Sequence, residues 1–305
     1  MMVPLGAQAD VTVYGRINNA IVFEDTGGTN GSTTDLRSIA SRFGVKASSD
    51  LGNGLQAHGH YEFSTVTAEE QNGIGDTRIA TAGISGGFGR VDVGNQWSAF
   101  FNSVGVDFDP TYWNSGIYGS ADPYRSSNTI KYSNSVGPLA LEVDLRLNDG
   151  KDTAKEGEHL RGTGGGVGLR VNVTDNVTLA AAFDTEDQTE EKPAGPETDR
   201  IGLSGHISFG QFWGKLAWSS RDTGTETDLA QLWVGADLTD STNAMIGYGQ
   251  SETDGIDETP SVVTLGLYHN MGGGLRLWYE GRSDDDDMPN TDNVVAHYAG
   301  IRYDF

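Results

Sequence analysis

The chain contains no cysteine, only eight prolines and no run of 18 apolar residues in its 305 positions. Without cysteine the protein has no disulfides, no zinc ribbon and no thiol nucleophile. A membrane-spanning helix needs about 20 consecutive apolar residues, so none is expected. The chain is therefore either soluble or crosses a membrane as strands.

Positive charge is also scarce. Lys and Arg number 20 against 43 Asp and Glu, which gives a formal net charge of -23. Nucleic-acid binding depends on clustered Lys and Arg that neutralise phosphates, so nucleic acid is excluded as a partner.

Several segments alternate strictly between apolar and polar residues. The pattern is clearest in VTVYGRINNAIVF (11–23), LQAHGHYEF (55–63) and LALEVDLRL (139–147). A period of two residues predicts strands with one apolar and one polar face. A whole face of charged residues suits a strand with lipid on one side and water on the other.

Short turn sequences join these strands in pairs. They are DLGNG (50–54), GGFG (86–89), SVGP (135–138), TDN (174–176), FGQ (209–211), LTDST (238–242) and NMGGG (270–274). Longer acidic loops lie between the pairs. With an unpaired first and last strand, this spacing predicts an all-β fold, a transmembrane, antiparallel, up-and-down β-barrel of sixteen strands. Closure removes the edge strands that a bilayer cannot hydrate.

The first residues differ from the rest. Ala7-Gln8-Ala9 has the small-x-small form that signal peptidases cut, so we expect residues 1–9 to be the remnant of a cleaved export signal. The alternative is a chance Ala-rich tail. Residues 10–305 are then expected to form a single barrel domain that ends on Phe305.

Four segments together resemble the general diffusion porins of Gram-negative outer membranes. They are VTVYGRINNAIVF (11–23), RFGVKASSDLGNGLQAHGHYEF (42–63), GGFGRVDVGNQ (86–96) and the terminal YDF. The resemblance implies a water-filled homotrimer in the bacterial outer membrane, in contact with lipid and lipopolysaccharide, through which small hydrophilic solutes diffuse. It also implies that the third loop, residues 99–127, folds into the lumen and narrows it.

The same resemblance implies a constriction with acids on the loop and bases on the opposite wall. The candidate acids are Asp107, Asp109 and Asp122, and the candidate bases are Arg16, Arg42 and Lys46. Such an arrangement would filter solutes by size and charge. Arg37 has the opposite parity to these bases and is expected near the loop end of its strand, outside the apolar band.

The net charge predicts whether the channel prefers cations or anions. Abundant carboxylates should concentrate cations at the mouth, so we expect cation selectivity that salt weakens. One alternative is a substrate-selective channel for a sugar or a small organic acid, with the aromatic residues of the third loop as a track. Another is a soluble, exported, carbohydrate-binding β protein.

Two groups of residues are of types that bind metal ions. The run Asp284, Asp285, Asp286 and Asp287 could bind Ca²⁺ weakly, although a solvated charged loop explains it as well. His58 and His60 share one strand face but lack a third ligand. No cofactor is required, and no motif predicts an enzyme.

The outward positions of the later strands carry large apolar side chains, whereas those of the early strands carry small ones. The small residues are Gly15, Ala47, Ala57, Gly59, Ala80 and Ala82. Because small residues let barrel walls approach closely, we expect the subunit interface on the first five strands.

Overall fold

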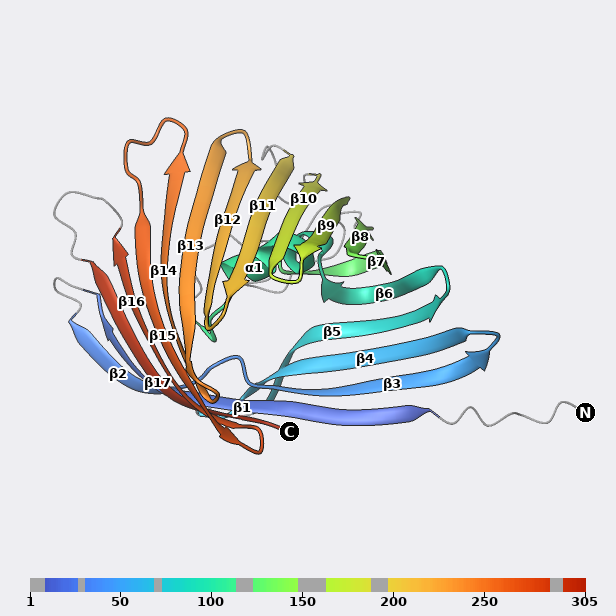
Figure 1. The fold of residues 1–305 in the computed structure, drawn as a ribbon, viewed down its shortest axis with the longest axis horizontal. Coiled ribbons are helices and arrows are strands. Elements are labelled where there is room, and N and C mark those ends of the chain that lie inside the picture. Colours follow the sequence, from blue (N-terminus) through green and yellow to red (C-terminus); the bar gives the residue numbers. More distant parts are fainter. Residues whose placement is uncertain are drawn as a thin grey trace, which may run out of the picture.

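A single antiparallel sheet closes on itself to form a barrel (Figure 1). The computed structural model describes residues 9–26, 31–68, 73–113, 123–147, 163–187, 197–285 and 293–305. Residues 1–8, which carry most of the predicted leader, lie outside this part. The strands are β1 (Asp10–Asp25), β2 (Ser32–Ser38), β3 (Arg42–Gly52), β4 (Leu55–Val66), β5 (Gly73–Gly86), β6 (Gly89–Trp97), β7 (Arg125–Val136), β8 (Leu139–Arg146), β9 (Gly164–Thr174), β10 (Val177–Glu186), β11 (Thr198–Phe209), β12 (Phe212–Asp222), β13 (Glu226–Thr239), β14 (Thr242–Thr253), β15 (Ser261–Gly272), β16 (Leu275–Asp285) and β17 (Val294–Asp304).

These seventeen strands form the sixteen spanning strands of the barrel. The first half of β1 pairs with β3 and its second half pairs with β2, so β2 and β3 are two parts of one spanning strand. The break is at residues 39–41, where Ala40 has a φ of 51°. The prediction of a sixteen-stranded antiparallel barrel is confirmed, and tight turns occur at all seven predicted places.

The same break changes which residues face inward along the spanning strand formed by β2 and β3, because an extra residue shifts the alternation by one position. Arg37 therefore points inward, where it contacts Glu24 at 2.7 Å. The sequence-based placement of Arg37 on the other face was wrong for this reason.

The barrel closes between its first and last strands. β1 pairs with β17 from Arg16↔Asp304 to Asp25↔Val295. Gly15 and Phe305 exchange backbone hydrogen bonds of 2.9 and 3.1 Å. The Phe305 ring then lies directly over Gly15, where any side chain would overlap it.

Substitution of Gly15 by valine should therefore lower the thermal stability of the barrel. An added Cβ would lie 2.9 Å or less from the ring atoms of Phe305. Because Phe305 is exposed and is the last residue, its ring can turn aside, and we expect a cost at the low end of the overpacking range, about 1 kcal/mol. The measurement is thermal unfolding in detergent, followed by circular dichroism. The control is Gly214→Val on β12, outside the predicted subunit interface, because a Cβ there meets nothing closer than 3.6 Å. Equal melting of the two variants would contradict the closure role of Gly15.

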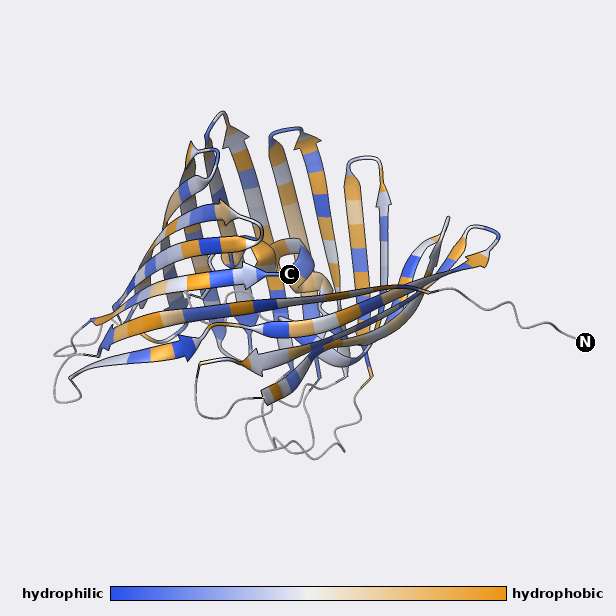
Figure 2. Ribbon diagram, turned by 90° about the horizontal axis from the view of Figure 1, so that it is seen from below, coloured by the Kyte–Doolittle hydropathy of each residue, from blue (hydrophilic) through white to orange (hydrophobic). Residues whose placement is uncertain are grey.

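The two faces of the wall differ in polarity, as the alternating bands along the strands in Figure 2 show. Outward residues such as Val11, Leu203 and Ile207 are 52–61% exposed although they are apolar. No helix among the described residues is long and apolar enough to cross a membrane. An apolar outer band on a closed sheet is what a lipid bilayer requires.

The third loop enters the barrel after β6. It contains a π-helical turn, η2 (Phe101–Gly105), which continues into the short helix α1 (Val106–Phe108). Figure 1 shows α1 within the curve of the strand wall. The predicted entry of the third loop into the lumen is thus seen for its described part, which is residues 98–113 and 123–124.

Candidate functional site

The loop begins with a buried anchor on β8. The amide of Ala99 donates a 2.6 Å hydrogen bond to Asp144, and Asn102 donates one of 2.7 Å to Glu142. Ser98 accepts from the amide of Phe101 at 2.9 Å and donates to the carbonyl of Pro123. The first turn of the loop is thereby tied both to the wall and to the returning chain.

Glycines on the wall provide room for the next turn. A side chain at Gly168 would come within 2.5 Å of the Ala99 carbonyl, and one at Gly202 within 2.8 Å of the Phe100 ring. The loop and the wall then bury a shared apolar cluster, which consists of Phe100, Phe101, Val104, Phe108, Ala180, Ala182 and Ala217.

Asp107 is the second anchor. It is 2% exposed and contacts Arg170 at 2.8 Å and Lys215 at 3.2 Å, while Ser204 donates a 2.7 Å hydrogen bond to it. Burial raises the pKa of the Asp107 carboxyl, but Lys215 and Arg170 lower it by more, so the pKa lies below its ordinary value. This acid fastens the loop to β9, β11 and β12 and does not face the predicted bases.

Tyr112 and Trp113, which we call the loop tip, are held by Glu280 on β16. The Glu280 side chain is fully buried. It accepts hydrogen bonds from the amides of Tyr112 at 2.6 Å and Trp113 at 3.1 Å, and from the Tyr268 hydroxyl at 2.8 Å. The Tyr112 ring packs edge-on against Tyr268 and Trp278. Sequence reasoning missed Glu280. The feature of the sequence that could have indicated it is an acid at an inward position of β16 with apolar residues around it.

The wall next to the loop tip carries five arginines, which we call the arginine wall: Arg16, Arg42, Arg78, Arg276 and Arg302. Their side-chain ion-pair partners among the described residues are two carboxylates. Asp304 contacts three of them at 2.8–3.6 Å, and Glu62 contacts the other two at 2.7 and 3.8 Å. The arginine wall is therefore net positive.

The loop tip touches this wall. The guanidinium of Arg302 lies 4.4 Å from the centre of the Tyr112 ring, and Arg276 donates a 3.4 Å hydrogen bond to the Tyr112 hydroxyl. Tyr112 thus orders two of the five arginines. Arg276 and Arg16 remain the most open, with 38% and 23% of their side chains exposed.

The predicted constriction residues fall into three groups. Arg16 and Arg42 face each other across β1 and β3, as part of the arginine wall. Lys46 lies four residues beyond Arg42, above the Tyr14 ring at 4.9 Å. Asp109 is half-buried just after α1, and Asp122 lies outside the described residues.

The other candidate groups have local partners. Asp284 contacts Arg282 at 2.6 Å, and Asp286 and Asp287 are outside the described residues. Among the residues that the structure describes, no three His, Asp or Glu side chains are grouped as for a metal ion. His58 contacts Ser85 and His60 contacts Tyr14. Weak Ca²⁺ binding stays a prediction.

A family model described as Gram-negative porin matches residues 1–288. The chain belongs to the Gram-negative porin family. This porin is 33% identical over 160 residues to the major outer membrane protein P.IB of Neisseria meningitidis serogroup B, serotype 15, in a match that covers 48% of this chain and 46% of that protein. The match thus spans about half the length of that relative.

Solved structures show the same fold. One is the anion-selective porin from Comamonas acidovorans, with a TM-score of 0.80 at 18% identity, covering 98% of this chain and 100% of that one. Another is the trimer form of OmpT of Vibrio cholerae, with a TM-score of 0.77 at 16% identity, covering 97% and 99%. The porin is accordingly an outer-membrane barrel. Its family agrees with the prediction that it is not an enzyme.

Proposed function

We propose that the protein is a passive channel through which small hydrophilic solutes and ions diffuse across the outer membrane. A closed barrel with many charged side chains on its inner face supports this, as does a loop that enters the lumen and is anchored to that face. We further propose a homotrimer, supported by a structural relative described as a trimer. The interface on the first five strands and contact with lipopolysaccharide stay predictions.

The arginine wall favours anions at the constriction. Its five arginines share two carboxylates, and Asp107, the buried loop acid, is already neutralised by Arg170 and Lys215. The net charge of -23 predicts the opposite, a preference for cations. We give the wall more weight because a permeating ion passes it at close range, whereas charge on the outer loops is screened beyond about 10 Å at 0.1 M salt. Support also comes from the structural relative described as anion-selective.

A substrate-selective channel for a small organic acid is the second candidate. Guanidinium groups bind carboxylates in a bidentate geometry, and the side chains of Arg276 and Arg16 are partly exposed. A saturable block of the ionic current by one acid, and not by others of similar size, would distinguish this candidate from a general channel. No such block is expected for a neutral sugar.

The test is a recording of single insertions in a planar bilayer under a salt gradient. Three equal sublevels and a reversal potential of anionic sign are expected. Arg42→Gln should reduce the anion-to-cation permeability ratio about two- to fivefold, because a unit charge about 4 Å from an ion in water is worth about 1 kcal/mol. The control Arg90→Gln removes an arginine that already pairs with Asp92. A cationic reversal potential in the parent channel would refute the anion preference and support the prediction from net charge.

A further inference from the structure

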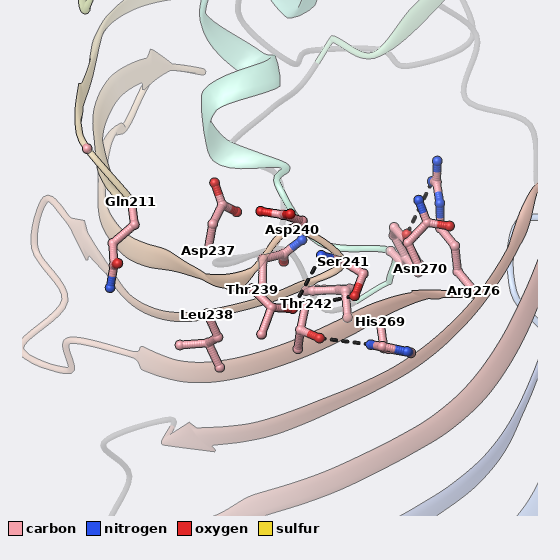
Figure 3. A pocket seen from close by; sticks show the side chains of 14 residues that line it. Gln211, Asp237, Leu238, Thr239, Asp240, Ser241, Thr242, His269, Asn270 and Arg276 are labelled. Atoms are coloured by element: carbon pink, nitrogen blue, oxygen red, sulfur yellow. Dashed lines mark hydrogen bonds between the residues drawn. The ribbon is translucent and has the colours of Figure 1, made fainter. Parts of the chain in front are cut away.

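A cavity of about 690 Å³ lies beyond the loop tip, at the barrel end that carries the short turns (Figure 3). Its lining comes from the turns that follow β11 and β13, from the ends of β15 and β16, and from Tyr112 of the loop. We call it the turn-side cavity. Its volume is within the range of small-molecule sites, about 300–1,000 Å³.

The cavity has two charged sides. Asp237 and Asp240 lie on one side and Arg276 on the other, as Figure 3 shows. Neither carboxylate has a hydrogen-bond or ion-pair partner within the described ranges. Arg276 reaches Asp304 only at 3.6 Å and keeps 38% of its side chain exposed. Two unpaired carboxylates and a guanidinium that is weakly paired and partly exposed are thus available to a solute.

Neutral groups also line the turn-side cavity. Asn243 and Asn270 supply amides, and Tyr112 and Tyr268 supply aromatic rings whose centroids are 4.8 Å apart. Amides can bond a polar backbone, and the rings can contact a short carbon chain. A solute with separated charges would therefore find polar and aromatic partners in the cavity besides the charged groups.

We propose that the turn-side cavity is a docking subsite for linear zwitterionic solutes. The ammonium end would face Asp237 and Asp240, and the carboxylate end would face Arg276. The two carboxylates repel a purely anionic solute, and a purely cationic solute has no carboxylate to offer Arg276, so both bind more weakly than the zwitterion. The subsite rests on the proposed passive channel, but it does not depend on the sign of the ionic preference.

The test uses three probes of nearly equal size in single-channel recordings. 6-Aminohexanoate carries both charges, its N-acetyl derivative only the negative one, and 6-aminohexanamide only the positive one. Added on the turn side, 6-aminohexanoate should reduce the open-channel current in a saturable way, and more strongly than either derivative. In the double variant Asp237→Asn/Asp240→Asn, the half-blocking concentration should rise about three- to tenfold, as expected for the loss of about 0.7–1.4 kcal/mol.

The matched control is Asp50→Asn/Asp175→Asn. These aspartates belong to two other short turns, so the control makes the same change in charge at the same end of the barrel. Its block by 6-aminohexanoate should match that of the parent channel. An equal weakening in the control, or a parent channel that shows no saturable block by the zwitterion while still conducting, would overturn the subsite. Failure of the channel proposal would instead appear as the absence of any conductance from folded protein.

Discussion

Replacement of Glu280 by leucine is expected to raise the single-channel conductance and to make the open current noisy. Glu280 accepts hydrogen bonds from two loop amides and one tyrosine hydroxyl, and it is fully buried. Each buried donor left unpaired costs about 1–3 kcal/mol. The population of channels with a released loop tip should therefore rise about tenfold or more. Planar-bilayer recording measures both effects.

A carboxylate removed elsewhere controls for charge alone. Glu252 lies on the exposed end of β14, where its partner is Gln250, and Glu252→Leu should leave the open-channel noise unchanged. If Glu280→Leu conducts as quietly as the parent channel, the loop tip is held by its other contacts, and the role assigned to Glu280 is wrong.

Asp107→Asn should loosen the middle of the loop and make the channel more anion-selective. The amide keeps the shape of the side chain but leaves Arg170 and Lys215 without their carboxylate. Both cations are partly exposed, at 26% and 19%, so water offsets much of the loss. We expect the free energy that holds the loop in place to fall by about 1 kcal/mol, so the population of channels with a released loop should rise roughly fivefold. The reversal potential should also shift toward anions.

Asp92→Asn is the matched control, because Asp92 also pairs with an arginine but lies on β6, away from the loop anchors. It should leave the current noise of the parent channel unchanged. The pH dependence gives an independent check. Because the native pKa of Asp107 is lowered, its stabilising charge is complete above the ordinary aspartate value of about 3.9 and is lost only as the pH falls through the native pKa. Loop-dependent noise in the parent channel should thus stay constant from pH 7 to pH 5, and a rise over that range would contradict the anchor.

Much of the barrel was predictable because it follows from local rules. Alternation placed Val11, Leu203 and Ile207 outside, and glycine-rich turns set the ends of the strands. The shift at Ala40 was not predictable, since its left-handed backbone depends on pairing with β1 and not on the residue itself.

The site was only partly predictable. Arg16 and Arg42 could be assigned to the inner face by parity, but the partners of Asp107 could not, because Arg170 and Lys215 come from distant strands. Gly168 and Gly202 leave room for the third loop. This role could not be read from the alternation of side chains, because it depends on the loop that lies over these two residues.

The three loop anchors also have a consequence for assembly. Tyr112 and Glu280 are separated by 168 positions, and β16 is among the last strands of the chain. Contacts of high sequence separation form late in folding because the intervening chain must be ordered first. The narrow passage therefore cannot exist until almost every strand has joined the wall, and a half-assembled barrel would be a wide, unselective opening. Completion of the filter and sealing of the barrel are, in effect, the same late event.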